Sequence, residues 1–195
     1  FEYGGKIGLP NGVVVQRKKG GAVYLVNEGN LKGVSSSKVL EELGFSNKDI
    51  IKIDDAEANF HKISSESFEE EINVRPNDVL VRTEGQNLIY LYKDKKLYPI
   101  MDKKIKNVNF EYHPVVEISE KEADGYKIVK PLIMRDGTLL TPTEGKDKGV
   151  VYIIANGNLC AFSSKEKFDE AGYSLENVVK VPLKVFEMHT IGERI

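Results

Sequence analysis

Two histidines in matching sequence contexts are the residues most able to bind a metal. His61 lies in the segment 60–63 and His189 in the segment 188–191, and each stands two residues before an isoleucine. A zinc site needs three or four ligands at suitable spacing, and neither histidine has a second ligand within helical or strand spacing. A third segment of the chain has a similar pattern, and there Tyr126 stands in the place of the histidine. Packing explains the two histidines better than metal binding does, and the sequence predicts no metal site.

Nucleophilic catalysis and phosphate binding also lack their usual sequence patterns. The serines at 35–37 and 163–164 are not part of a Gly-x-Ser-x-Gly turn, which would expose a catalytic hydroxyl. The glycine-rich segment 4–8 has neither a preceding strand nor a following helix, and it lacks the spacing of a phosphate-binding loop. Cys160, the only cysteine, lies in a predicted strand, where we expect a buried and inert thiol. The sequence therefore predicts no catalytic residues, no cofactor and no enzyme activity.

Aromatic residues are the best candidates for ligand contact, because a ring with a hydroxyl suits carbohydrate. Tyr24, Tyr90 and Tyr152 each occupy the middle of an apolar segment, which is typical of a core residue. Tyr92 and Tyr98 stand at positions where two other segments of similar sequence have no tyrosine. We expect both at the surface, as candidate ligand-facing residues. The chain has no Trp to strengthen this interpretation.

The charge balance limits the classes of partner. The 195 residues carry 28 Lys and Arg against 30 Asp and Glu, and the formal net charge of −2 gives no field that would attract nucleic acid or anionic lipid. The longest apolar runs, such as 150–155, have the length of a strand, so we expect no membrane span. The chain begins with Phe1 rather than Met, which leaves open processing after export or excision from a longer chain.

An internal repeat organises the chain. Its first part is a turn and a strand, followed by a second strand centred on a tyrosine and a hairpin into a third strand. The turn and first strand occur at 10–15, 76–81 and 135–140, and the second strands are centred on Tyr24, Tyr90 and Tyr152. The third copy has an insertion at 144–149, whose composition predicts a longer hairpin loop.

A short helix follows in the first and third copies. Ser36 and Ser164 suit the residue that begins a helix, and Gly44 and Gly172 suit a left-handed residue that ends it. Replacing either glycine with Ala should then cost on the order of 1 kcal/mol of folding free energy. The second copy lacks this glycine, and we expect its segment 105–113 to be a degenerate helix or a loop.

The sequence thus predicts an α+β, mainly β fold of three tandem repeats of about sixty residues, each a small β-meander with one short helix. A unit of this size is marginal alone, so packing between repeats should stabilise it. We expect an N-terminal extension at 1–8, repeat 1 at 9–65, an acidic linker at 66–73, repeat 2 at 74–130 and repeat 3 at 131–195.

The unit resembles a short tandem repeat of exported bacterial cell-envelope proteins, in which a strand that begins at a glycine leads to a Val-Tyr strand. The residues that carry the resemblance are Gly137–Leu139, Val151–Ile154, Asn156-Gly157, Phe162–Ser164, Phe168, Ala171–Tyr173 and Val178–Val181, with their counterparts in the first copy. The resemblance implies a nonenzymatic extracellular or cell-surface module that binds or spaces a surface polysaccharide or a protein partner. The alternative is a structural subunit of a surface layer or an extracellular filament, whose copies would join by pairing strands.

Overall fold

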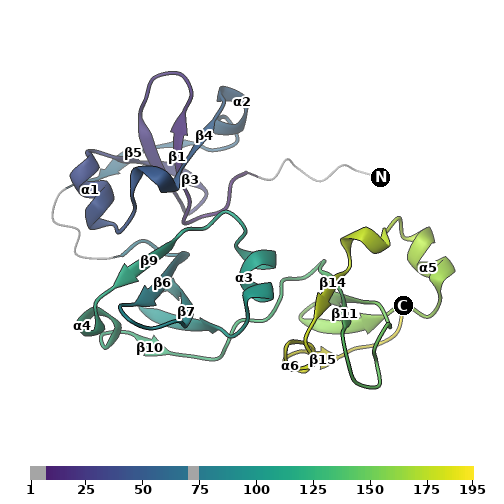
Figure 1. Ribbon diagram of the computed structural model, residues 1–195. Helices are drawn as coiled ribbons and strands as arrows, with labels where there is room; N and C mark the ends of the chain where they lie inside the picture. The colour runs from purple at the N-terminus through teal and green to yellow at the C-terminus, as the bar shows by residue number, and fades with distance from the viewer. Residues whose placement is uncertain (1–7, 70–74) are drawn as a thin grey trace. The chain divides into compact units, whose positions relative to one another are not determined.

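The computed structural model describes residues 8–69 and 75–195, in which three five-stranded sheets follow one another along the chain (Figure 1). The strands of repeat 1 are β1 (Val14–Arg17), β2 (Val23–Asn27), β3 (Asn30–Val34), β4 (Ile50–Ile53) and β5 (Ile63–Phe68). Those of repeat 2 are β6 (Val79–Thr83), β7 (Ile89–Lys93), β8 (Lys96–Ile100), β9 (Val115–Ile118) and β10 (Lys127–Ile128). Those of repeat 3 are β11 (Leu139–Pro142), β12 (Tyr152–Ala155), β13 (Asn158–Ala161), β14 (Val179–Val181) and β15 (Thr190–Ile191).

The three sheets share one topology. In each, the first strand pairs antiparallel with the second and parallel with the fourth, and the third strand pairs parallel with the fifth. The fourth and fifth strands are therefore the two edges of every sheet. The three strand tyrosines occupy the same register, because Val15 pairs with Tyr24, Val81 with Tyr90 and Leu140 with Tyr152. The prediction of a mainly β fold with three repeats is confirmed.

Each repeat contains two short helices rather than the one that we expected. The first helix connects the third and fourth strands, and these helices are α1 (Ser37–Glu42), α3 (Lys103–Asn109) and α5 (Lys165–Glu170). The second helix connects the fourth and fifth strands, and these helices are α2 (Asp55–Ala58), α4 (Glu120–Ala123) and α6 (Leu183–Phe186). Side-chain caps begin two of the second helices, α2 and α4, whereas α6 begins after Pro182 without one. In α2, for example, Asp54 and Glu57 accept hydrogen bonds from each other's amides, both at 2.9 Å.

The prediction of a degenerate helix or loop in repeat 2 is wrong, because α3 is a regular helix of seven residues. Asp102 begins it by accepting a hydrogen bond from the Lys104 amide at 2.9 Å. Ile105 anchors it in the core with no exposed surface. The segment lacks the glycine that ends the other two helices, but a cap and one buried apolar residue are enough to form the helix.

The predicted ends of α1 and α5 are confirmed. The hydroxyl oxygens of Ser36 and Ser164 each accept a hydrogen bond from the amide three residues later, at 3.2 and 3.3 Å. Gly44 and Gly172 have φ angles of 88° and 77°, which are left-handed conformations that a Cβ disfavours. Local sequence rules are therefore sufficient for these two helices.

Contacts divide the described chain into two compact units. The first contains repeats 1 and 2, apart from the segment 100–111 that includes α3. The second contains that segment together with the chain from Pro131 onward. The two units do not coincide with the three repeats, because repeats 1 and 2 share one unit and α3 belongs to the other.

The first residues of the acidic linker expected at 66–73 are part of a strand instead. Residues 66–68 belong to β5, which pairs with β3 through Ser67 and Phe68. The rest of the expected linker from residue 70 and the expected N-terminal extension up to residue 7 lie outside the described residues. The hydrogen-bonding demand of the β3 edge explains why a polar, glutamate-containing segment forms a strand here.

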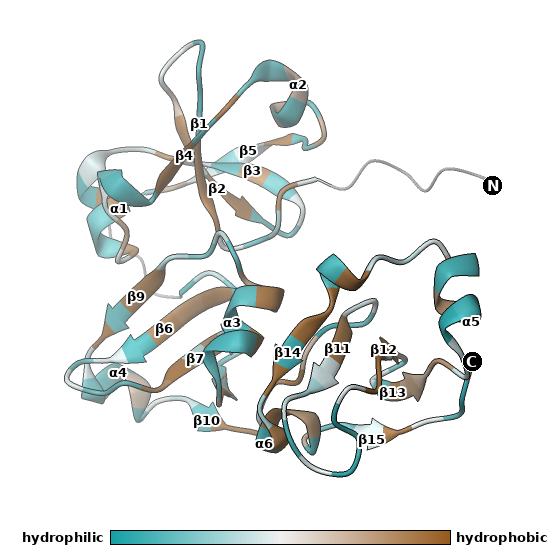
Figure 2. Cartoon of the chain, turned by 45° about the vertical axis from the view of Figure 1, so that its right-hand side comes forward, coloured by the Kyte–Doolittle hydropathy of each residue, from teal (hydrophilic) through white to brown (hydrophobic). Residues whose placement is uncertain are grey.

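The two faces of the first sheet are buried in different ways. One face joins α1 and the second sheet in a single cluster, whose buried members are Val14, Leu25, Val39, Leu40, Leu43, Phe45, Val79, Val81, Tyr92, Leu97, Val116 and Ile118. The other face forms a cluster within repeat 1, made of Val13, Val15, Val26, Leu31, Ile53 and Ala58. Figure 2 shows the corresponding colouring, since β6 and β9 are mostly hydrophobic and α5 is mostly hydrophilic. Repeat 2 therefore covers a face that repeat 1 leaves open.

Gly44 lies at this contact between repeats 1 and 2. A Cβ built on Gly44 would lie 2.2 Å from Cγ1 of Val116 in β9. No other described atom lies within 4 Å of a Cβ built on Gly172. The two glycines look alike in the sequence, but only Gly44 also makes room for a neighbouring repeat.

The two glycine-to-alanine variants should therefore differ in stability. Gly172→Ala should cost about 1 kcal/mol through backbone strain, and Gly44→Ala about 2–4 kcal/mol because Val116 must also move. Chemical denaturation of both variants measures the difference. Gly85→Ala is the matched control, since Gly85 also has a positive φ of 72° and open space around it. Equal losses for Gly44→Ala and Gly172→Ala would contradict the role of Val116.

Candidate functional site

The two tyrosines that we expected at the surface do not form an exposed site. Tyr92 is only 1% exposed, and its ring centroid lies 4.8 Å from that of Tyr126 within the core cluster. The prediction of a ligand-facing Tyr92 is therefore wrong, because both faces of β7 are covered and the sequence does not reveal the covering element. Tyr98 is half-buried in β8. Among the described residues, the exposed tyrosines are Tyr112 at 63% and Tyr173 at 38%.

The two histidines in matching contexts each accept a hydrogen bond from an amide that precedes the first strand of their repeat. His61 Nε2 accepts from the Leu9 amide at 2.8 Å, and its Nδ1 lies 2.8 Å from the Gly29 carbonyl oxygen. His189 Nε2 accepts from the Met134 amide at 3.2 Å, and its Nδ1 lies 3.1 Å from a carbonyl oxygen of α6. Each ring ties the segment before the first strand to a later part of the same repeat. No group of three or more His, Cys, Asp or Glu within 8–69 and 75–195 is arranged to hold a metal ion.

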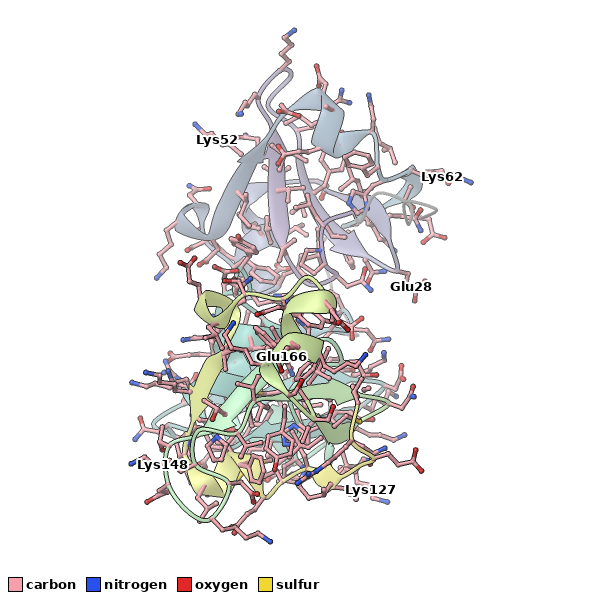
Figure 3. The ribbon with its side chains drawn as sticks, turned by 90° about the vertical axis from the view of Figure 1, so that its right-hand side faces the viewer. Glu28, Lys52, Lys62, Lys127, Lys148 and Glu166 are labelled. Carbon is pink, nitrogen blue, oxygen red and sulfur yellow. The ribbon has the colours of Figure 1, made fainter. Side chains whose placement is uncertain are left out.

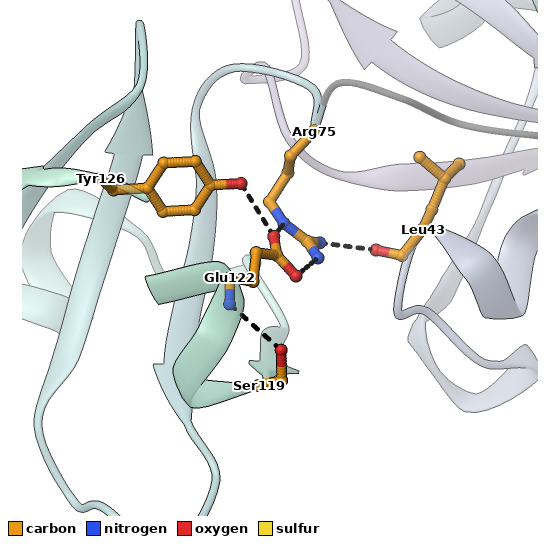
Figure 4. A network of polar contacts seen from close by, with 5 residues as sticks. All are labelled: Leu43, Arg75, Ser119, Glu122 and Tyr126. Carbon is orange, nitrogen blue, oxygen red and sulfur yellow. Dashed lines mark hydrogen bonds and ion pairs between the residues drawn. The ribbon is translucent and has the colours of Figure 1, made fainter. Parts of the chain in front are cut away.

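Repeat 2 has a charged network at the corresponding place (Figure 4). Arg75 donates to the two carboxylate oxygens of Glu122 through Nε at 2.7 Å and Nη2 at 3.1 Å. The Tyr126 hydroxyl donates to the same carboxylate at 2.9 Å. Arg75 Nη1 also donates to the carbonyl oxygen of Leu43, at 3.0 Å. Because Leu43 lies at the end of α1, this network fastens repeat 1 to repeat 2.

The network keeps its charges near neutral pH. Burial tends to raise the pKa of Glu122, but the hydrogen bonds and charge of Arg75 and the bond from Tyr126 outweigh it, so this pKa lies below its usual value. Burial, and then the bond to Glu122, raise the pKa of Tyr126 to about 12. An acid–base catalyst works best with a pKa near the ambient pH, and neither group has one. The arrangement fits an ion pair that joins two repeats.

A pocket of about 490 Å³ lies beside the first helix of repeat 1. It is bounded by the start of β2, the end of β3 and the start of α1, and its lining carries no charged side chain. The lining residues are Gly21, Ala22, Val23, Tyr24, Gly33, Val34, Ser35, Ser36, Ser37, Leu40, Asn47 and Ser67. The side chains of Ser35, Ser37 and Asn47 make no hydrogen bond to any described residue, so they are available to a ligand.

Repeat 3 has a smaller pocket, of about 290 Å³, at the equivalent place. Every residue of its lining stands 128 positions after a lining residue of the first pocket, and the set is Gly149, Val150, Val151, Phe162, Ser164, Lys165, Phe168 and Leu175. The pocket is therefore a product of the repeat fold, since it recurs where helix, second strand and third strand meet.

The two pockets differ in size and polarity because of their side chains. In repeat 3 the residues are larger and mostly apolar: Val150 replaces Ala22, Phe162 replaces Val34, Lys165 replaces Ser37 and Leu175 replaces Asn47. The rings of Phe162 and Phe168 also meet edge to face there, with centroids 5.2 Å apart. Lys165 is paired with Asp169 at 2.5 Å. The first pocket thus suits a polar, neutral ligand, and the second suits an apolar group.

Sequence reasoning did not find the first pocket, because it assigned the serines at 35–37 only to helix capping. Ser36 has that role, whereas Ser35 and Ser37 do not take part in a cap. A usable signal was present in the repeat alignment. Small or polar residues occupy positions in repeat 1 where repeat 3 has bulky ones, and such a difference predicts space that one copy keeps open.

No family model and no curated protein matches the chain. Among solved structures, the chain is similar to the periplasmic assembly from the ESX-5 inner membrane complex, with a TM-score of 0.24 and 11% identity over 95% of this chain and 69% of that one. It is also similar to an intact ESX-5 inner membrane complex, with a TM-score of 0.25 and 9% identity over 96% of this chain and 52% of that one. Likeness at this level assigns neither a family nor a function.

Acid should weaken the ion pair between repeats 1 and 2. Because folding lowers the pKa of Glu122 from about 4.3, its contribution to stability is complete above about pH 5.5 and is lost as the pH falls through the lower folded pKa. Glu122→Gln should cost about 1 kcal/mol at pH 7, and its difference from the wild type should shrink below about pH 4. Urea denaturation across this pH range measures both effects.

Tyr126→Phe provides the control, because it removes one hydrogen bond and leaves the carboxylate paired with Arg75. Its stability difference from the wild type should depend less on pH than that of Glu122→Gln. A constant difference between Glu122→Gln and the wild type from pH 3 to pH 7 would show that this ion pair contributes nothing.

Proposed function

We propose that this chain is a noncatalytic cell-envelope module that binds a surface polysaccharide in the pocket of repeat 1. The observation that supports it is the uncharged lining of that pocket, with free hydroxyl and amide groups. Its volume of about 490 Å³ lies within the roughly 300–1,000 Å³ that is typical of small-molecule sites. Ser35, Ser37 and Asn47 offer both donors and acceptors, which neutral sugar hydroxyls require. A charged ligand would find no opposite charge in the lining.

Two further observations support a role outside the membrane core. The repeat unit resembles repeats of exported cell-envelope proteins, as its sequence motifs indicate. None of the described helices could cross a bilayer, since even α3 has seven residues against the roughly 20 that a crossing needs. The serines at 35–37, Asn47 and Ser67 are all exposed, so one sugar unit of a long polymer can reach them from solvent.

A structural subunit of a surface layer or filament is the second candidate. Three isoleucines at the same repeat position favour it, because Ile63, Ile128 and Ile191 begin or end edge strands and are 54%, 60% and 57% exposed. An edge strand with an exposed β-branched residue is suited to pairing with another chain. By contrast, the opposite edge of the first sheet carries Lys52, which points away from the ribbon in Figure 3 and discourages such pairing.

Substitutions taken from repeat 3 test the polysaccharide site. Asn47→Leu and Ser37→Lys place in repeat 1 the residues that repeat 3 tolerates at the same positions, so both variants should fold. Each should weaken binding of a neutral wall oligosaccharide at least tenfold, because Asn47→Leu removes a hydrogen-bonding amide, Ser37→Lys replaces a hydroxyl with a charged group, and both make the pocket smaller. Isothermal titration and retention on purified wall polysaccharide measure the effect.

Leu175→Asn in repeat 3 is the matched control and should leave this binding unchanged. Wild-type protein that is not retained by any neutral wall polysaccharide, or variants that bind as well as the wild type, would overturn the proposed site. Polymers that form in the absence of saccharide and are lost in Ile128→Thr would instead support the filament subunit.

A further inference from the structure

A second pocket adjoins the pocket of repeat 1 that is proposed to bind a sugar. It has a volume of about 340 Å³ and is lined by Ser37, Leu40, Glu41, Ser46, Asn47 and Lys48. Three of these residues, Ser37, Leu40 and Asn47, also line the first pocket. The two pockets therefore share a boundary, and a ligand longer than the first pocket has room to continue into the second.

The shared boundary combines one buried apolar side chain with two free polar ones. Leu40 is only 3% exposed and contributes apolar surface to both pockets. Ser37 and Asn47 are exposed, and their side chains make no hydrogen bond to any described residue. The amide of Asn47 has two donor hydrogens and an acceptor oxygen, so it is able to bind a group in each pocket at once. The boundary thus connects the pockets chemically.

The second pocket lies between α1 and a 3₁₀ turn formed by Asn47–Asp49. The carboxylate of Asp49 accepts hydrogen bonds from the amide of Ser46 at 2.8 Å and from its hydroxyl at 2.7 Å. These two bonds fix the start of the turn, as in a capping box. The turn carries Asn47 and Lys48, so one side of the pocket is held in place before any ligand arrives.

Two opposite charges line the second pocket without forming a pair. Glu41 on α1 and Lys48 on the turn are both exposed, and neither makes an ion pair or a side-chain hydrogen bond with any residue in 8–69 or 75–195. A carboxylate only accepts hydrogen bonds, and an ammonium group only donates them. A sugar hydroxyl does both, so a neutral sugar unit matches the two groups at the same time.

Repeat 3 lacks this pair of free charges. Lys165 is paired there with Asp169 at 2.5 Å, and Asp169 corresponds to Glu41. The residue at the position of Lys48 is Glu176, so the ammonium group is missing as well. The repeat fold therefore forms without them, and the free carboxylate and ammonium groups are a property of repeat 1.

We propose that repeat 1 binds two successive units of the surface polysaccharide, one in each pocket, an inference that rests on the proposed function and extends it. The first unit contacts the uncharged lining. The second unit hydrogen-bonds through its hydroxyls to Glu41 and Lys48, and Asn47 contacts both units. The protein then recognises a segment of a chain rather than a single sugar, so affinity rises from one unit to two and levels off beyond the second pocket.

Saccharides of increasing length test this inference. Fragments of one, two and four sugar units are prepared by partial hydrolysis of the neutral wall polysaccharide that retains the wild type, and NMR titration measures their affinities. The two-unit fragment should bind at least about tenfold more tightly than the one-unit fragment, because hydrogen bonds to charged groups are the strong ones. The four-unit fragment should add little to this gain.

A double variant removes the charged groups of the second pocket alone. Glu41→Ala with Lys48→Ala should lose the gain and bind one unit as the wild type does. Lys38→Ala with Glu42→Ala is the matched control and should keep the gain, since it removes an ion pair of 3.9 Å from the same helix outside both pockets. Both variants preserve the net charge and replace exposed residues, so folding should be preserved, which circular dichroism checks.

The outcomes distinguish the second pocket from the proposed function itself. Equal affinity for one and two units, or a gain that the Glu41 and Lys48 double variant keeps, would overturn the second pocket and leave the first in place. A gain that the Lys38 and Glu42 control also loses would overturn it too, because any change on the helix would then be enough. A wild type that binds no fragment of any length would overturn both pockets.

Discussion

A sheet that is apolar on both faces has to be covered twice, and each repeat of this protein has too little helix to cover both. The six residues of α1 span about 9 Å, whereas five strands side by side span about 19 Å between the outer two. One face of the first sheet is closed within repeat 1, around Ile53 and Ala58. The other face is closed only when repeat 2 contributes Val116 and Ile118 to the same cluster. That face is therefore buried only when the two repeats are in contact. This dependence explains why a unit of about sixty residues occurs here in tandem.

This constraint also determines what the sequence could predict. Ser36 and Gly44 act through hydrogen bonds and backbone angles within a few residues, and the sequence alone was enough to place the helix between them. The same comparison of copies failed for α3, because the missing glycine was given more weight than Asp102, which stands at the cap position of Ser36 and also caps its helix. It failed for Tyr92 for a different reason. A strand that is apolar on both faces shows no alternation, so the element that covers it is decided by tertiary contacts.

The three repeats keep the contacts that close each unit and differ in the contacts that meet a neighbour. In every repeat, the side chain before the first strand accepts a hydrogen bond at 2.8 Å from an amide in the turn after the second strand: Asn11 from Gly29, Asn77 from Asp94 and Asp136 from Gly157. The residue at the position of the two histidines makes different contacts in repeat 2. His61 and His189 bind an amide of their own repeat, whereas Tyr126 belongs to the ion-paired network that reaches α1. Each repeat therefore holds this turn with its own residues, whereas the contacts between repeats depend on which neighbour is present.

The two equivalent pockets separate what the fold requires from what it permits. The fold requires a gap between the first helix and the adjacent strands, because the gap recurs in repeats 1 and 3 with different side chains. It does not require that the gap be polar, since Leu175 takes the place of Asn47 and stays 59% exposed without disturbing the helix cap. The side chains of Asn47, Ser35 and Ser37 have no hydrogen-bond partner among the described residues, so their polarity contributes nothing to folding that repeat 3 lacks. These side chains are exposed and hydrogen-bond to water in the absence of a ligand, so they are open to one, and for this reason the pocket of repeat 1, rather than that of repeat 3, is the better candidate for recognition.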